Sequence, residues 1–174
     1  AECLICVNGE TANESSNLSY GFLDLPSTAD PTLNRCQSAI GKATSAFLGA
    51  QSRAYQKCWD GRLNGKHTNS CVPTALGDGT YQAAIAKAET RRTATIVKAC
   101  GGTDRALGGG DDLTPAQIGF PADCPAVMTP DGDACGALVT DLSGLVTCVD
   151  CLAELEGACV DRLGVPQFAS YPAQ

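Results

Sequence analysis

Apolar residues recur at helical spacing along the first third of the chain. From Cys36 onward they are separated by four, three, four, three, four and four positions, namely Cys36, Ile40, Ala43, Phe47, Ala50, Ala54 and Cys58. Residues three and four apart share one face of an α-helix, so this spacing predicts an amphipathic helix. Asp30 followed by Pro31 is a typical helix start, because Asp caps free amides and Pro suits the first helical position.

A second, less regular helix is predicted from Tyr81 to Cys100, with Gly101-Gly102 as its end. Its buried side is marked by Ile85, Ala88, Ile96 and Cys100, and its polar side by Lys87, Glu89, Arg91 and Arg92. The segment 61–78 between the two helices is rich in turn-forming residues. Two helices of similar length joined in this way predict an antiparallel hairpin over residues 30–100.

The helical pattern returns from about Cys135. Apolar residues then follow spacings of four, three, four and three, at Leu138, Leu142, Leu145, Val149 and Leu152. This pattern predicts a third helix over residues 135–160, with a possible break at Gly144, that packs its leucine stripe on the hairpin.

The remaining segments lack a clear period. Residues 1–29 read as an irregular arm, 101–134 as a loop-rich stretch with a capping-box pattern at Thr114 to Gln117, and 161–174 as a tail. The expected fold is therefore all-α. It is a single domain over residues 1–174, made of a disulfide-stapled antiparallel helical hairpin and a third helix, with long irregular loops and an N-terminal arm.

Cysteine usage indicates the compartment. The chain has 11 cysteines in 174 residues and only 5% aromatic residues, so cross-links would support a core of small side chains. Cysteines spread along a whole chain favour disulfides and an oxidising compartment. No apolar run is long enough to span a membrane. A start at Ala1 fits a mature form without its signal peptide, and we expect a secreted protein, extracellular or periplasmic.

Helix geometry suggests which cysteines pair. In an antiparallel hairpin Cys36 lies opposite Cys100, while Cys58 lies at the loop end near Cys71. A turn-rich stretch separates two more cysteines, which makes a local bridge plausible. The disulfide candidates are Cys36 with Cys100, Cys58 with Cys71, and Cys124 with Cys135.

Five cysteines have no clear assignment. Cys3-x-x-Cys6 and Cys148-x-x-Cys151 could together supply four thiolates to zinc or an iron–sulfur centre, and Cys159 completes the odd number. Each of the five is a thiol, a disulfide cysteine or a metal ligand. Disulfides are the preferred interpretation in an oxidising compartment, so no metal and no cofactor is expected.

Other chemical groups favour structural roles. The single histidine, His67, lies in a polar loop without a nucleophile motif. Asp111-Asp112 and Asp131-Gly132-Asp133 could hold calcium, but turn chemistry explains them better. Trp59 is expected to cover the neighbouring disulfide. Asn13 and Asn17 lie in glycosylation sequons, whose use depends on the source.

The balance of charge bears on partners. A net charge of −7 argues against nucleic acid and anionic membranes as partners. Lys87, Arg91 and Arg92 are expected to form a solvated helix face.

Several motifs resemble those of cysteine-rich helical domains in secreted proteins of environmental bacteria, over roughly residues 33–160. They are Cys36-Gln37-Ser38-Ala39-Ile40-Gly41-Lys42, Lys57-Cys58-Trp59, Lys98-Ala99-Cys100-Gly101-Gly102, Asp111-Asp112-Leu113-Thr114-Pro115, Gly119-Phe120-Pro121 and Cys148-Val149-Asp150-Cys151. The resemblance implies secretion and disulfides. It brings no assigned activity, and the arm with Cys3 and Cys6 lies outside it.

These patterns establish an architecture and a compartment rather than a specific activity. The leading hypothesis is a non-enzymatic secreted subunit that works through contacts with other protein subunits or by self-assembly, for example in an extracellular filament or surface complex. The alternative is a module that binds a small ligand or a metal, either between the helices or through Cys3/Cys6 and Cys148/Cys151.

Overall fold

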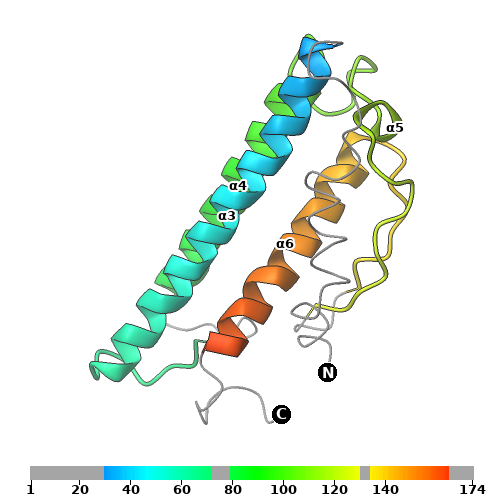
Figure 1. Ribbon diagram of the computed structural model, residues 1–174. Coiled ribbons are helices and arrows are strands. Elements are labelled where there is room, and N and C mark those ends of the chain that lie inside the picture. The colour runs from blue at the N-terminus through cyan, green and yellow to red at the C-terminus, as the bar shows by residue number, and fades with distance from the viewer. Residues whose placement is uncertain (1–29, 72–78, 130–133, 165–174) are drawn as a thin grey trace.

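The computed structural model describes residues 30–71, 79–129 and 134–164. These ranges contain helices α3 (Pro31–Leu63), α4 (Thr80–Cys100), α5 (Pro115–Ile118) and α6 (Leu142–Gly164), and their only β-pairings are two isolated bridges. Figure 1 shows α3 and α4 side by side as an antiparallel hairpin, with α6 packed along it. The all-α expectation is confirmed. No helix in the described ranges is long and apolar enough to cross a membrane.

Helix α3 forms where the periodicity predicts it. The Asp30 carboxylate accepts hydrogen bonds from the backbone N–H groups of Thr32 (2.8 Å) and Leu33 (3.1 Å), and Pro31 is the first helical residue. The expected stripe faces inward, with Ala50 half-buried and the other six residues buried. The capping signal and the 3.6-residue period therefore determined both the start of this helix and its buried face.

Helix α4 also begins and ends where expected, within one residue. Gly79 precedes it with a φ of +80°, a conformation in which a side chain would be strained, and Gly101 caps its end. A disulfide joins Cys36 to Cys100 at one end of the hairpin, and a second joins Cys58 to Cys71 at the other. Both pairs are those that an antiparallel hairpin predicts.

Helix α6 differs from its prediction at the start. It begins at Leu142 rather than near Cys135, and it runs through Gly144 without a break. Leu138, placed on the predicted stripe, is 69% exposed. Residues 135–139 instead pair with the preceding loop, where the N–H of Cys124 donates to the carbonyl of Ala137 and the N–H of Val139 to that of Ala122. This pairing satisfies backbone groups that a helix would otherwise use.

Two disulfides tie this loop to α6. Cys124 is joined to Cys148 and Cys135 to Cys151, so the predicted bridge between Cys124 and Cys135 is wrong. Cys148 and Cys151 are three residues apart and share one face of the helix. Each of the two paired loop segments presents one cysteine to that face. The turn between Cys124 and Cys135 therefore brings the two loop segments together, and the two disulfides join these segments to α6.

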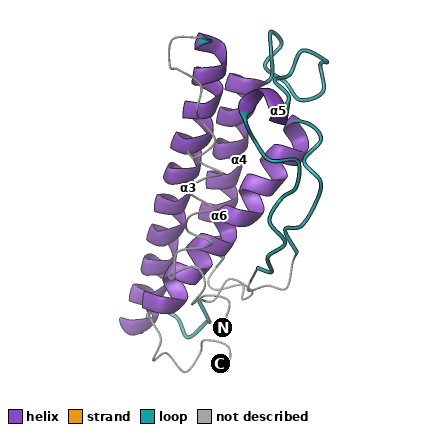
Figure 2. Ribbon diagram, turned by 45° about the vertical axis from the view of Figure 1, so that its right-hand side comes forward, coloured by secondary structure: helices purple, strands orange, loops and turns teal. Residues whose placement is uncertain are grey.

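The main core lies between α6 and the hairpin, close to the Cys36–Cys100 disulfide. It contains the buried stripe of α6, namely Leu142, Leu145, Val149 and Leu152, together with Ile40 and Ile96. Helix α5 closes one end through the predicted capping box at Thr114, and the Gln37 side-chain amide donates to the carbonyl of Ile118 (2.8 Å). Figure 2 shows the loop segments along the other side of α6.

Candidate functional site

Disulfides account for two of the five cysteines that the sequence left unassigned. Cys148 and Cys151 are disulfide-bonded, so they cannot supply thiolates to a metal, and that part of the metal hypothesis is wrong. Cys159 is buried on α6. Cys3 and Cys6 lie outside the described residues, as do the sequons at Asn13 and Asn17.

The loop that follows α3 holds His67 in a structural environment. Its ring lies next to Gly61, and one of its ring nitrogens lies within 4.8 Å of the sulfurs of Cys58 and Cys71. Those sulfurs form a disulfide and are therefore not thiolate ligands. Trp59 is buried in the same cluster, and its indole N–H donates to Asp161 (3.3 Å). These contacts join the far end of the hairpin to α6.

Three carboxylates meet in the glycine-rich loop after α4. Asp104, Asp111 and Asp112 each accept a backbone N–H, from Ala106 (2.9 Å), Thr103 (2.6 Å) and Gly108 (2.8 Å) respectively. Hydrogen bonds from the backbone and the side chain of Thr103 hold the pKa of Asp111 below its usual range. Turn chemistry therefore explains the Asp111-Asp112 pair. The sequence 131–133 lies outside the described residues.

Asp111→Ala is expected to open this loop without unfolding the bundle. The Thr103 amide should then exchange with solvent about tenfold faster, because its charged acceptor is gone. Since the folded-state pKa of Asp111 is lowered, its contribution is complete above the ordinary carboxyl pKa and is lost as the pH falls through the lowered value. Amide hydrogen exchange by NMR measures this. An equal change in Asp123→Ala, at an exposed site nearby in the sequence, would contradict it.

The most unusual side chain in the described ranges is a buried arginine. Arg92 is 2% exposed, and its guanidinium lies 4.1 Å from the centre of the Phe47 ring and forms an ion pair with Asp150 of α6. Burial lowers its pKa to about 10, while the charges of Glu154 and Glu89 act in the opposite direction. The prediction that Arg92 belongs to a solvated face is wrong. Arg92 instead connects all three long helices.

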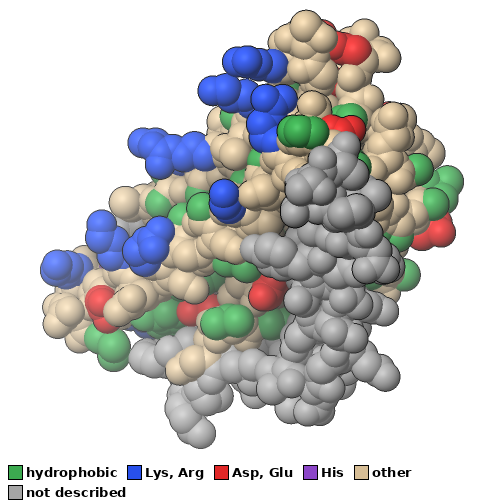
Figure 3. Space-filling view, turned by 45° about the horizontal axis from the view of Figure 1, so that its top comes forward, with side chains coloured by type: hydrophobic (Ala, Val, Ile, Leu, Met, Phe, Trp, Pro, Cys, Tyr) green, Lys and Arg blue, Asp and Glu red, His purple; other side chains and the backbone are tan. Residues whose placement is uncertain are grey.

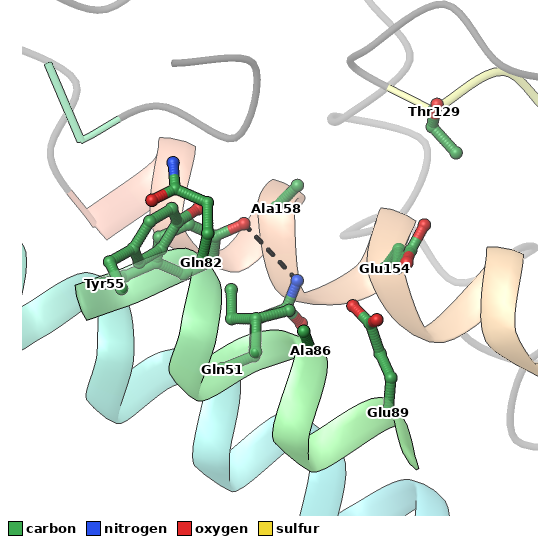
Figure 4. A pocket seen from close by; sticks show the side chains of 10 residues that line it. Gln51, Tyr55, Gln82, Ala86, Glu89, Thr129, Glu154 and Ala158 are labelled. Carbon is green, nitrogen blue, oxygen red and sulfur yellow. Dashed lines mark hydrogen bonds between the residues drawn. The ribbon is translucent and has the colours of Figure 1, made fainter. Parts of the chain in front are cut away.

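Next to this arginine, α3, α4 and α6 border a partly open cavity of about 280 Å³. Its wall combines apolar and acidic groups, namely Gln51, Tyr55, Tyr81, Gln82, Ile85, Ala86, Glu89, Thr129, Glu154 and Ala158. Figure 4 shows Glu89 reaching from α4 towards Glu154 on α6, with Gln51 and Tyr55 deeper between the helices. The Gln51 side-chain amide donates to the Tyr55 hydroxyl (3.3 Å).

The other notable surface is a basic groove along the hairpin. Helices α3 and α4 carry nine of the chain's 12 Lys and Arg residues, but only two acidic residues, Asp60 and Glu89. Between them lies a hollow of about 370 Å³ lined by Arg53, Lys87 and Arg91 together with small residues, including Ala43, Ala46, Ala50, Ala84 and Ala88. Figure 3 shows the Lys and Arg side chains in a row along one side of the molecule. We call the groove lined by Arg53, Lys87 and Arg91 the basic face.

Comparison with known proteins adds no assignment. No protein-family model, curated protein or solved structure matches the chain significantly. The resemblance to secreted bacterial cysteine-rich domains stays a prediction.

Sequence reasoning named the space between the helices as an alternative ligand site without identifying the residues that line it, and it overlooked the basic face. The cavity needs three helices in register, which no single stretch encodes. The basic face had a visible signal, since bases dominate both helices of the hairpin while acids dominate residues 101–164. The net charge of −7 averages over these two parts and conceals their opposite signs.

Proposed function

We propose that this protein is a non-enzymatic structural subunit, secreted to an extracellular or periplasmic space, that assembles through protein–protein contacts made by the basic face. The four disulfides within the described ranges support an oxidising compartment. The observation that carries the proposal is the separation of charge, because a cationic groove on a chain of net negative charge is a surface for an acidic partner.

A second copy of the chain offers such a partner. Residues 101–164 contain 11 acidic residues, whereas the only basic residues in this range are Arg105 and Arg162. Four of the acidic side chains are exposed, namely Asp104, Asp111, Asp123 and Asp141. Contact between the basic face of one copy and this acidic region of the next is head-to-tail. A head-to-tail contact leaves one complementary surface open at each end, so it builds filaments or rings rather than closed dimers.

Charge reversal in the groove tests this assembly. We expect the wild-type protein to form larger species as salt falls from about 0.5 M to about 0.02 M, because screening weakens contacts between exposed charges. The double variant Lys87→Glu, Arg91→Glu should stay monomeric, and multi-angle light scattering reports the mass. The double variant Lys42→Glu, Lys98→Glu has the same net charge but changes exposed bases outside the groove lining, and it should assemble like the wild type.

Mixing variants tests the head-to-tail geometry. The groove variant retains its acidic region, and the variant Asp104→Lys, Asp123→Lys retains its groove, so together they should form a heterodimer that grows no further. A wild-type protein that is monomeric at every salt concentration would refute self-assembly. Self-assembly would also be refuted if the basic face bound an oligonucleotide instead of a second copy of the chain. An equal loss of assembly in the Lys42→Glu, Lys98→Glu control would refute the role of the groove.

A further inference from the structure

The basic side chains of the hairpin lie along one stripe of each helix. On α3 they are separated by seven, eleven and four residues, close to whole numbers of helical turns, and all are exposed, namely Arg35, Lys42, Arg53 and Lys57. Helix α4 has exposed bases at intervals of four and seven residues, namely Lys87, Arg91 and Lys98. Since Arg53, Lys87 and Arg91 line the groove, the two stripes form its rims.

Two contacts fix the register of α3 against α4. The Cys36–Cys100 disulfide joins the helices near one end. The Tyr55 and Tyr81 rings, whose centres are 5.1 Å apart, meet 19 residues further along both helices, counted from Cys36 and from Cys100. Each residue of α4 therefore lies at a defined level along α3.

In this register the seven cations form one regular series along the hairpin, which we call the basic row. In order of level they are Arg35, Lys98, Lys42, Arg91, Lys87, Arg53 and Lys57. Successive members are three or four residues apart in level, which corresponds to about 4.5–6 Å along the helix axis. The row extends over the 22 residues from Arg35 to Lys57, or about 33 Å. Figure 3 shows these charges along one side of the molecule.

The charges of the basic row are not neutralised by the protein. Within residues 30–71, 79–129 and 134–164 none of the seven forms an ion pair, whereas the buried Arg92 pairs with Asp150. Between the rims, the floor of the groove consists mainly of alanines, so a ligand can lie along it. Because like charges in a row repel one another, the surface favours an anion long enough to neutralise several of them.

The spacing and surroundings of the row select among linear polyanions. Duplex DNA carries one charge per about 1.7 Å, roughly three times the density of the row. Single-stranded nucleic acid is held by bases stacked on aromatic rings, but Phe47, Tyr55, Trp59 and Tyr81 of these helices are all buried. Helices that lie on membranes insert large apolar side chains, and the groove offers alanines in their place.

A polysaccharide of uronic acids has the matching repeat. It carries one carboxylate on each sugar ring, so its charges recur at the length of one ring, which is about one helical turn of 5.4 Å. The flat faces of its rings present C–H groups that fit a floor of small side chains, while the carboxylates reach the Lys and Arg side chains on the rims.

We propose that the basic row binds an acidic polysaccharide with one carboxylate per sugar ring, laid lengthwise along the hairpin. This role goes beyond the contact between copies, because Arg35, Lys42, Lys57 and Lys98 lie outside the groove lining. The polysaccharide also covers the groove, so it and a second copy of the chain are alternative occupants there.

Isothermal titration calorimetry on the full chain tests the proposal, with oligogalacturonates as probes. An octamer is long enough to follow the whole row, a trimer covers less than half of it, and a fully methyl-esterified octamer is a neutral analogue. We expect saturable binding of the octamer, affinity at least about tenfold lower for the trimer because fewer charges are paired, and no binding of the ester.

Charge reversal locates the bound octamer. Lys42→Glu, Lys98→Glu should lower its affinity about tenfold, because two attractive contacts become repulsive. Lys66→Glu, Arg105→Glu is the matched control, since it changes the net charge equally at exposed bases beyond the ends of α3 and α4. The control should bind within about twofold of the wild type.

The outcomes separate this proposal from general attraction and from self-assembly. Equal weakening by the two double variants would overturn it, as would equal affinity for trimer and octamer, absence of saturable octamer binding, or tighter binding of a single-stranded oligonucleotide of equal charge. Lys42→Glu, Lys98→Glu should lose the octamer and still self-assemble. A wild-type protein that binds the octamer but never self-assembles would refute the assembly alone.

A second variant keeps the test decisive. Circular dichroism shows whether each variant is folded. If Lys42→Glu, Lys98→Glu does not fold, Lys87→Glu, Arg91→Glu, which also lies in the basic row, should show the same loss of octamer affinity, and unchanged affinity there would overturn the proposal.

Discussion

Arg92→Ala is expected to destabilise the protein by about 3 kcal/mol, measured as the free energy of unfolding in urea. The substitution removes an ion pair to Asp150 and a guanidinium stacked on Phe47, and it leaves a void among α3, α4 and α6. Asp150 is 38% exposed on its side chain, so water can hydrate the carboxylate that is left, which keeps the cost below that of a fully buried charge.

The neighbouring arginine supplies a matched control. Arg91 is exposed on the same helix, and Arg91→Ala should change the unfolding free energy by no more than about 0.5 kcal/mol. A double-mutant cycle of Arg92→Ala with Asp150→Ala isolates their coupling from the loss of packing. If the two arginine variants were equally stable, Arg92 would not be buried as described.

Removal of the Cys36–Cys100 disulfide, by replacing both residues with alanine, should cost about 4 kcal/mol. The bridge joins residues 64 apart, so its absence frees a long loop in the unfolded chain. Both cysteines are fully buried beside the main core, where Ile40 and Ile96 also pack. Loss of the bridge therefore also loosens the end of the hairpin on which α6 rests. Urea unfolding under non-reducing conditions gives the value.

The bridge between Cys58 and Cys71 is the internal comparison. It joins residues only 13 apart, and its removal in the same way should cost about 3 kcal/mol. The order of the two values tests the chain-entropy argument, because both variants lose one disulfide and gain two alanines. An equal or larger loss for the shorter loop would mean that local packing, for example of Trp59, outweighs chain entropy there.

Local signals explain what was predictable. Asp30-Pro31 and Gly101 mark helix ends because caps act on backbone groups within one turn. The stripe from Cys36 to Cys58 indicates a buried face because a helix repeats every 3.6 residues. Antiparallel pairing of two such helices then leaves few choices for Cys36, Cys58, Cys71 and Cys100, and the two bridges predicted for the hairpin are present.

Where prediction failed, long-range contacts outweighed local patterns. The leucine stripe extended the third helix back to Leu138, yet hydrogen bonds between the loop segments around Cys124 and Cys135 hold that stretch away from the helix. The same two segments each present one cysteine to α6. Cys124 and Cys135 therefore form disulfides with Cys148 and Cys151 of the helix, and not with each other across the turn. Proximity along the sequence did not identify the disulfide partners of Cys124 and Cys135, because both cysteines face the same side of α6.

By itself, the sequence determined an all-α, disulfide-stapled hairpin with a third helix. Periodicity and capping act over one or two turns, and the antiparallel hairpin that they define then decides which of its cysteines meet. Only the tertiary structure decided the environment of each charge. Arg92 and Arg91 are adjacent and alike in sequence, but the first meets Asp150 and Phe47 in the interior and the second faces the groove. The cavity with Glu89 and Glu154 likewise exists only where three helices meet. Burial and electrostatic surroundings depend on neighbours far along the chain, and a local pattern does not encode them.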